Sequence, residues 1–165
     1  MRILLPLIGL LSLLLGTACS VPGTASDDAQ SGHVAYVIDG DTIVVRLAGG
    51  DRVHVRLIGI DTPEISHGRG ETSQCYGQAA TRITRRLADD RDVVLTVGRE
   101  RHDRYGRLLA YVRVTGGPPD LERELLRLGA ARTLAIAPNV DRAAEYSQVA
   151  RAARRAGRGM WGSCA

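Results

Sequence analysis

Alternation of apolar β-branched residues with polar ones predicts five short strands. Three of them follow closely on one another, over residues 33–38, 42–47 and 52–60, and two more cover residues 92–97 and 108–114. Within the third stretch the valines and the leucine alternate with Arg52, His54 and Arg56. Successive side chains of a strand point to opposite faces, so Arg56 is expected on the face opposite the apolar set.

Three other segments repeat their apolar residues at helical spacing. The first covers residues 76–87, and the second follows Pro118-Pro119 with Asp120 as the expected N-cap and Gly129 as its end. The third is rich in arginine and alanine, covers residues 141–156 and stops at Gly157. Five strands that mostly precede the helices predict an α+β fold, with a small antiparallel five-stranded OB-type β-barrel and about three α-helices packed against it. A generic α+β sandwich is the alternative.

The N-terminal segment has the pattern of an export signal. Arg2 is followed by an apolar run over residues 3–15, which is shorter than the roughly 20 residues of a membrane span and typical of a signal peptide. The run ends in Gly-Thr-Ala directly before Cys19 and resembles a bacterial lipobox, although Gly16 stands where Leu, Val or Ile is usual. Cleavage after Ala25 is the alternative.

From this pattern we predict a signal peptide over residues 1–19 with lipidation of Cys19, a flexible tether over residues 20–32 and a folded domain over residues 33–165. The protein is then exported, either as a lipoprotein on the extracytoplasmic face of the cell membrane or in secreted form. A lipid anchor would be its only membrane contact, and we expect a monomer.

Charge and cysteine content narrow the choice of partners. The formal net charge is +4, and every cationic side chain is an arginine. Mild basicity is compatible with a nucleic-acid partner without demonstrating one. If Cys19 carries lipid, Cys75 and Cys164 remain as a pair in an oxidising compartment, which predicts a disulfide. The sequence contains no CxxC motif, so a zinc site is not expected.

Two short motifs raise the question of chemistry. Asp39-Gly40 alone is most often a hairpin turn, and Asp61-Thr62-Pro63 alone is most often the end of a strand. Together, they place Asp41 and Asp61 at strand edges that can converge at one end of a barrel. Two facing carboxylates repel each other unless a cation lies between them, and oxygen ligands favour Ca²⁺ or Mg²⁺. Hydrolysis of a phosphodiester also requires an acid and cationic side chains. The sequence provides them in Glu64, Arg56 and a cluster over residues 103–107.

The motifs DGDT, VRLIGIDTPE, YGQAA, DRYGRLLAYV and GMWG occur in this order from about residue 33 to residue 162. In this order and spacing, the chain resembles the thermonuclease family, which has the staphylococcal-nuclease-like fold. The resemblance implies a role for each matching position. It implies that Asp41 and Asp61 bind Ca²⁺ through their carboxylates and that Thr62 binds it through its backbone carbonyl. Glu64 then positions or activates the attacking water, and Arg56 and Arg107 clamp the scissile phosphate. Arg104 and Tyr105 contact a terminal phosphate.

The implied activity is Ca²⁺-dependent hydrolysis of DNA and/or RNA that leaves 3′-phosphate ends. The alternative is a catalytically weak nucleic-acid- or protein-binding module of the same fold, and the presence of both metal ligands, the acid and both arginines argues against it. A purely structural envelope lipoprotein would leave this set unexplained. The family's tyrosines that pack against the nucleotide have no counterpart in residues 132–138. Because base stacking contributes about 1–3 kcal/mol per base elsewhere, we expect a high KM.

Overall fold

The computed structural model describes residues 29–66, 68 and 72–164. Cys19, the signal peptide and most of the expected tether lie outside these residues. In the part of the chain that is described, no helix is both long and apolar enough to cross a membrane.

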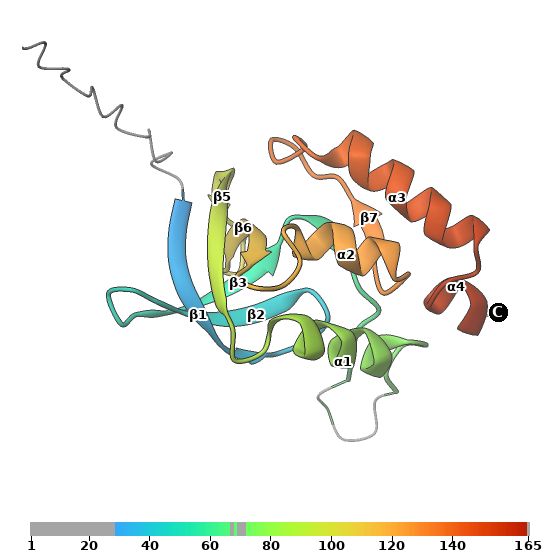
Figure 1. The fold of residues 1–165 in the computed structure, drawn as a ribbon, viewed down its shortest axis with the longest axis horizontal. Coiled ribbons are helices and arrows are strands. Elements are labelled where there is room, and N and C mark those ends of the chain that lie inside the picture. The colour runs from blue at the N-terminus through green and yellow to red at the C-terminus, as the bar shows by residue number, and fades with distance from the viewer. Residues whose placement is uncertain (1–28, 67, 69–71, 165) are drawn as a thin grey trace, which may run out of the picture.

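Five strands close into a barrel in the order β1-β2-β3-β6-β5, with β5 pairing back to β1 (Figure 1). The predicted five-stranded barrel is therefore confirmed, but not as an all-antiparallel one. β3 and β6 run parallel, because the connection between them is long enough for a crossover and carries a helix and another barrel strand. The strands are β1 (Ala29–Val37), β2 (Thr42–Leu47), β3 (Arg52–Leu57), β5 (Asp92–His102) and β6 (Leu108–Val114).

Three strand boundaries differ from the prediction, and one of them is the end of β5, which continues to His102 instead of stopping at residue 97. β1 begins at Ala29, and residues 29–33 pair with β5, so the last residues of the expected tether belong to the barrel. The expected strand over residues 52–60 is divided into β3 and β4 (Gly59–Asp61). Gly59 causes the division, because its φ of +82° turns the chain, and a Cβ there would lie 2.9 Å from the ring of Tyr146.

The helices are α1 (Gly77–Ala88), α2 (Leu121–Arg127), α3 (Ala143–Arg155) and a single-turn α4 (Met160–Ser163). The first three confirm the predicted helices, with ends shifted by one or two residues. Asp120 is the N-cap of α2 as expected, since its Oδ1 accepts a hydrogen bond from the Arg123 N–H at 2.7 Å. The short strand β7 (Arg132–Leu134) pairs with β4 outside the barrel, and the sequence pattern predicted neither β7 nor α4.

α1 positions the turn that begins the candidate site. Its buried face consists of small residues, among them Ala80, Thr84 and Ala88, which allows the helix to approach the barrel closely. The Thr84 hydroxyl donates to the Gly40 carbonyl at 2.7 Å. This hydrogen bond fixes the turn between β1 and β2 to α1, which follows later in the chain.

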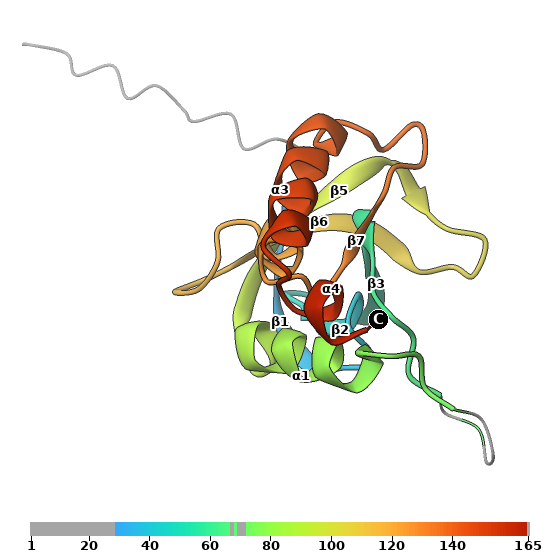
Figure 2. The ribbon, with the colours of Figure 1, turned by 90° about the vertical axis from the view of Figure 1, so that its right-hand side faces the viewer.

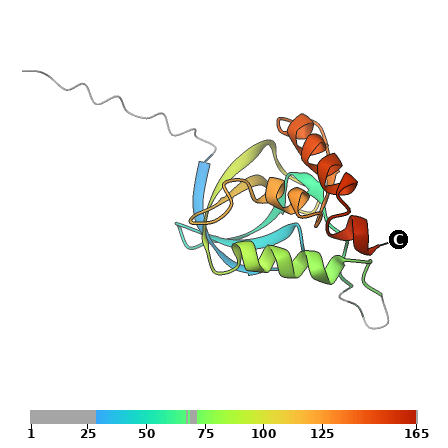
Figure 3. The same ribbon diagram turned by 45° about the vertical axis from the view of Figure 1, so that its right-hand side comes forward.

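A disulfide joins Cys75, just before α1, to Cys164, just after α4, as the sequence predicted. The S–S distance is 1.99 Å, and the two residues are 89 positions apart. Figure 3 shows the C-terminal end of the chain beside the start of α1.

Candidate active site

Asp41 is buried at the end of the barrel. Its side chain leaves the turn toward the protein interior, and the residue is 2% exposed. Oδ2 accepts hydrogen bonds from the Thr62 N–H at 2.8 Å and the Thr62 hydroxyl at 3.0 Å, and Oδ1 accepts one from the Thr42 hydroxyl at 3.2 Å. Gly40 permits this approach, because a Cβ there would lie 2.6 Å from the Thr62 hydroxyl oxygen. Hydrogen bonds from both threonines therefore fix Asp41, the second aspartate of the turn, in the site.

Arg56 connects the two aspartates of the predicted metal site. From β3 its guanidinium reaches Asp41 Oδ2 at 3.1 Å and Asp61 Oδ1 at 3.3 Å. It also donates to the Ile60 carbonyl at 3.1 Å, and its side chain is only 12% exposed. A planar guanidinium with several fixed partners is held in one orientation. The structure thereby brings both aspartates and Arg56 together, with Thr62 beside Asp41.

Arg107 is connected to Asp41 through the Thr42 hydroxyl. Its Nε donates to Asp103 Oδ2 at 2.7 Å, and its Nη1 donates to the Thr42 hydroxyl at 3.3 Å. That hydroxyl in turn donates to Asp41. Burial alone would raise the pKa of Asp103, but hydrogen bonds from the backbone and side chain of Arg107 outweigh it and lower the pKa. Arg56 and Arg107 are therefore linked through Thr42 and Asp41.

Three further acids lie around Asp41. Partial burial, followed by repulsion from Asp41, raises the pKa of Asp39, of Asp61 and of Glu64. Repulsion from Asp39 and Asp61 adds to the effect on Glu64, while Arg56 opposes it. The group therefore carries more negative charge than Arg56 compensates, and a bound cation would relieve the excess.

The donor set suits a hard cation that keeps several waters. Among the described residues no cluster of three or more acidic, histidine or cysteine side chains is arranged to hold a metal ion. The predicted ligand set contains only two carboxylates, with the Thr62 carbonyl as the third protein ligand. Asp41 Oδ1 accepts a hydrogen bond from Thr42 and keeps lone-pair capacity for a cation, and Asp61 is partly exposed. Oxygen ligands supplemented by water are the coordination that Ca²⁺ accepts.

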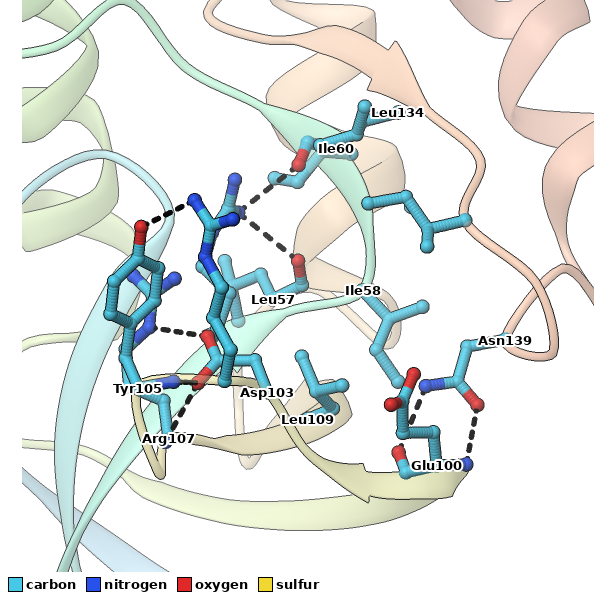
Figure 4. A pocket seen from close by; sticks show the side chains of 14 residues that line it. Leu57, Ile58, Ile60, Glu100, Asp103, Tyr105, Arg107, Leu109, Leu134 and Asn139 are labelled. Atoms are coloured by element: carbon cyan, nitrogen blue, oxygen red, sulfur yellow. Dashed lines mark hydrogen bonds and ion pairs between the residues drawn. The ribbon is translucent and has the colours of Figure 1, made fainter.

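A pocket of about 440 Å³ adjoins the arginines (Figure 4). Asp103, Tyr105 and Arg107 lie on one side of it, and Leu134 and Asn139 lie on the other. Arg104 is turned toward its neighbour, since its Nη2 donates to the Tyr105 hydroxyl at 2.6 Å and its Cζ lies 4.8 Å from the ring centroid. Tyr105 is 68% exposed, so this ring and guanidinium face solvent beside Arg107.

The opposite wall of the pocket includes aliphatic side chains. Leu134 and Ile136 line it, and both are well exposed, at 39% and 59%. They belong to the segment in which the sequence shows no aromatic residue. Exposed aliphatic side chains beside a polar rim offer apolar contact area without a stacking plane.

Sequence reasoning assigned no role to two residues that hold the site. Asp103 fixes Arg107 at a spacing of four residues, which a search for acid–arginine pairs could have found. Gln74 forms two hydrogen bonds with the backbone of Glu64. Its side-chain oxygen accepts from the Glu64 N–H at 3.2 Å, and its own N–H donates to the Glu64 carbonyl at 2.9 Å. No local pattern signals this second pair, since it depends on how the chain returns after residue 64.

Comparison with known proteins gives consistent matches. A family model described as "Staphylococcal nuclease homologue" matches residues 54–163. The thermonuclease of Staphylococcus hyicus is 33% identical over 139 residues, which are 84% of this chain and 80% of that protein. The thermonuclease of Staphylococcus intermedius is 41% identical over 110 residues, 67% of this chain and 63% of that protein. Endonuclease YhcR of Bacillus subtilis is 30% identical over 145 residues, 83% of this chain but 12% of that protein.

Proposed function

Since the chain belongs to the family of staphylococcal nuclease homologues, we propose that it is a Ca²⁺-dependent nuclease that hydrolyses phosphodiester bonds in DNA and/or RNA. The observation that supports this most directly is the link from Arg107 through Thr42 and Asp41 to Arg56, beside a cluster of acids with raised pKa values. Two positioned cations next to an excess of carboxylate are the parts that phosphodiester hydrolysis needs.

Asp41 and Asp61 would hold Ca²⁺ through their carboxylates, and Thr62 would hold it through its backbone carbonyl. When bound, the ion supplies Lewis-acid charge near the phosphate and offsets the repulsion among the acids. The hydrogen bonds to Asp41 and its contact with Arg56 keep this carboxylate in place.

Glu64 positions or deprotonates the attacking water. Partial burial, followed by repulsion from the neighbouring carboxylates of Asp41, Asp39 and Asp61, raises its pKa and makes it a stronger base. Gln74 holds its backbone on both sides, so the carboxylate leaves a fixed point of the chain.

Arg56 and Arg107 stabilise the charge that grows on the phosphate oxygens. Asp103 fixes the Nε side of Arg107 and leaves the rest of the fork directed toward the site, where it contacts the Thr42 hydroxyl. Guanidinium forks match phosphate oxygens in a bidentate way. Arg104 and Tyr105 contact a terminal phosphate at the pocket, and the cleavage leaves 3′-phosphate ends.

The remaining features of the proposal concern location and assembly. The protein is exported as a monomer, and lipidation of Cys19 or secretion decides whether it stays at the membrane. The disulfide between Cys75 and Cys164 supports an oxidising compartment.

Incubation of the purified protein with single-stranded DNA, duplex DNA and RNA, first with Ca²⁺ and then with a chelator, tests the activity. We expect cleavage that the chelator stops and that added Ca²⁺ restores. Asp41→Asn should weaken Ca²⁺ binding in a calorimetric titration, because it removes one of the two charged ligands. A protein that binds nucleic acid but cleaves none of these substrates at any Ca²⁺ concentration would instead be the binding module.

A further inference from the structure

A second basic surface lies next to the candidate active site, on the face where α3, α4 and β7 meet (Figure 2). We propose that this surface binds phosphates of the same nucleic-acid strand beyond the bond that is cleaved. The proposal rests on the proposed function, since it assigns a longer binding track to the same substrate.

The surface contains a cavity of about 190 Å³, lined among others by Arg132, Arg151, Arg154 and Trp161. We call these four residues the arginine groove. The Cζ atoms of Arg132 and Arg154 lie 5.9 and 5.3 Å from the centroid of the Trp161 ring. Stacking against an aromatic face restricts a guanidinium plane while its N–H groups remain available to a ligand. The groove therefore presents preoriented donors instead of freely moving side chains.

Of the three groove arginines, Arg132 lies near Asp61 and opposes the rise in its pKa, whereas the other two have no acidic partner among the described residues. Within the described parts of the chain, no carboxylate lies within 4.0 Å of Arg132, Arg151 or Arg154. Some exposed arginines elsewhere are paired, for example Arg123 with Glu145 at 2.9 Å. After Glu145 the sequence has four arginines and no acidic residue. The positive charge is available for an external anion.

The groove is continuous with the candidate site. In the small sheet, Arg132 lies directly opposite Asp61, and such cross-strand partners point to the same face with Cβ atoms about 4.5–5.5 Å apart. Asp61 in turn contacts Arg56. Arginines thus follow one another from Arg107 through Arg56 to the groove. A series of cations on one side of a phosphodiesterase site matches the repeating negative charge of a nucleic-acid backbone.

Salt dependence of binding tests the proposal. The purified wild type, Arg151→Ala/Arg154→Ala and a control, Arg82→Ala/Arg86→Ala, should be titrated against fluorescent oligothymidylates of 3 and 20 nucleotides. The control removes the same charge from exposed positions of α1. Each phosphate contact on a single strand contributes about 0.7 to the slope of log Kd against log salt concentration, so loss of two contacts should lower the slope by about 1.4. This change should appear only in the groove variant and only with the 20-mer.

Equal slopes in all three proteins, an equal loss in both double variants, or the same loss with the 3-mer would each overturn the proposal. Retained 20-mer affinity together with lost binding to phosphatidylserine vesicles would assign the groove to a membrane and also overturn it. Thermal melting controls for folding, and if the alanine variant is unstable, Arg151→Gln/Arg154→Gln keeps the side-chain stems. Cleavage of the 20-mer by the wild type with Ca²⁺ is scored separately. If it is absent under all conditions, the proposed function fails, whereas the binding slopes still decide whether the groove contacts nucleic acid.

Discussion

Among the described residues, two carboxylates are almost completely buried, and their surroundings differ. Asp41, 2% exposed, accepts hydrogen bonds from two threonines and contacts Arg56 at 3.1 Å. Glu122, 0% exposed on α2, accepts the Val112 N–H at 3.0 and 3.2 Å through its two oxygens. Burial raises the pKa of Glu122 well above its ordinary value, and the nearby Asp120 raises it further.

The difference shows what marks a reactive site in this fold. Glu122 attaches α2 to β6 and is surrounded by the structural network of Asp120, Arg142 and Tyr146. Asp41 instead has three further acids around it, contacts one arginine directly and is linked to a second through the Thr42 hydroxyl. A buried acid alone therefore indicates a structural role, whereas a buried acid between cations and partly exposed acids indicates a catalytic or metal-binding site.

The largest effect is expected for Arg107, whose guanidinium is linked to Asp41 through Thr42. Arg107→Ala should lower kcat by about 10²–10³-fold, since a positioned donor that stabilises developing charge is typically worth this much. Affinity for Ca²⁺ should hardly change. Saturation kinetics and calorimetry measure the two quantities, and Arg99→Ala serves as the control because its side chain is 69% exposed and pairs with Asp141. A kcat close to that of the wild type would remove Arg107 from the chemistry.

A smaller effect, on stability alone, is expected on the Glu122 side. Asp120→Ala should lower the free energy of unfolding by about 2–4 kcal/mol, because it removes the N-cap of α2 and leaves the buried Tyr146 hydroxyl and Arg142 without their acceptor. Urea denaturation measures the change, and kcat of the folded fraction should stay the same. Asp141→Ala, in an exposed ion pair, should cost less than about 1 kcal/mol. If Asp120→Ala lowered kcat as much as Arg107→Ala, the two regions would not differ in function as described.

The smallest effect is a change in pH dependence. The folded-state pKa of Glu122 is raised, so the folded protein binds more protons than the unfolded chain above pH 4.5, and the wild type loses stability as the pH rises through that pKa. Glu122→Gln should therefore gain stability relative to the wild type between pH 4.5 and 8. Urea midpoints across this range measure the difference.

Glu124, two residues further along α2, provides the opposite control. A hydrogen bond from Arg127 lowers its pKa, so its contribution to stability is present above pH 4.5 and is lost as the pH falls below that value. Glu124→Gln should gain on the wild type only toward acid pH. The same trend in both variants would contradict the raised pKa of Glu122.

Much of the fold follows from the sequence. The alternation of apolar residues and the proline and glycine boundaries predicted the five barrel strands, the three main helices and the Asp120 cap, all of which are local signals. The parallel pairing of β3 with β6 and the pairing of β4 with β7 join segments far apart in the chain, and no local pattern specifies such partners. β7 is also only three residues long, and all three are exposed, so it has no apolar alternation to reveal it.

The candidate site divides in the same way. Asp41, Arg56, Asp61, Glu64 and Arg107 were identified from motifs and spacing, and the structure brings them into one region. Their roles in catalysis stay predictions. Gln74 and Thr42 contribute through contacts that appear only when the turn, the loop after β4 and the turn before β6 are folded together. Lipidation of Cys19 remains an expectation from sequence.

The disulfide divides the covalent chain into a ring and a tail. Residues 75–164 form the ring, which includes Arg107, whereas Asp41, Arg56, Asp61 and Glu64 all precede Cys75 on the open tail. A single proteolytic cut within the ring leaves one covalent molecule of nearly unchanged migration until it is reduced. A cut between Glu64 and Cys75 separates the acidic ligands from Arg107 at once, so reducing and non-reducing gels of a partial digest reveal which half of the site was opened.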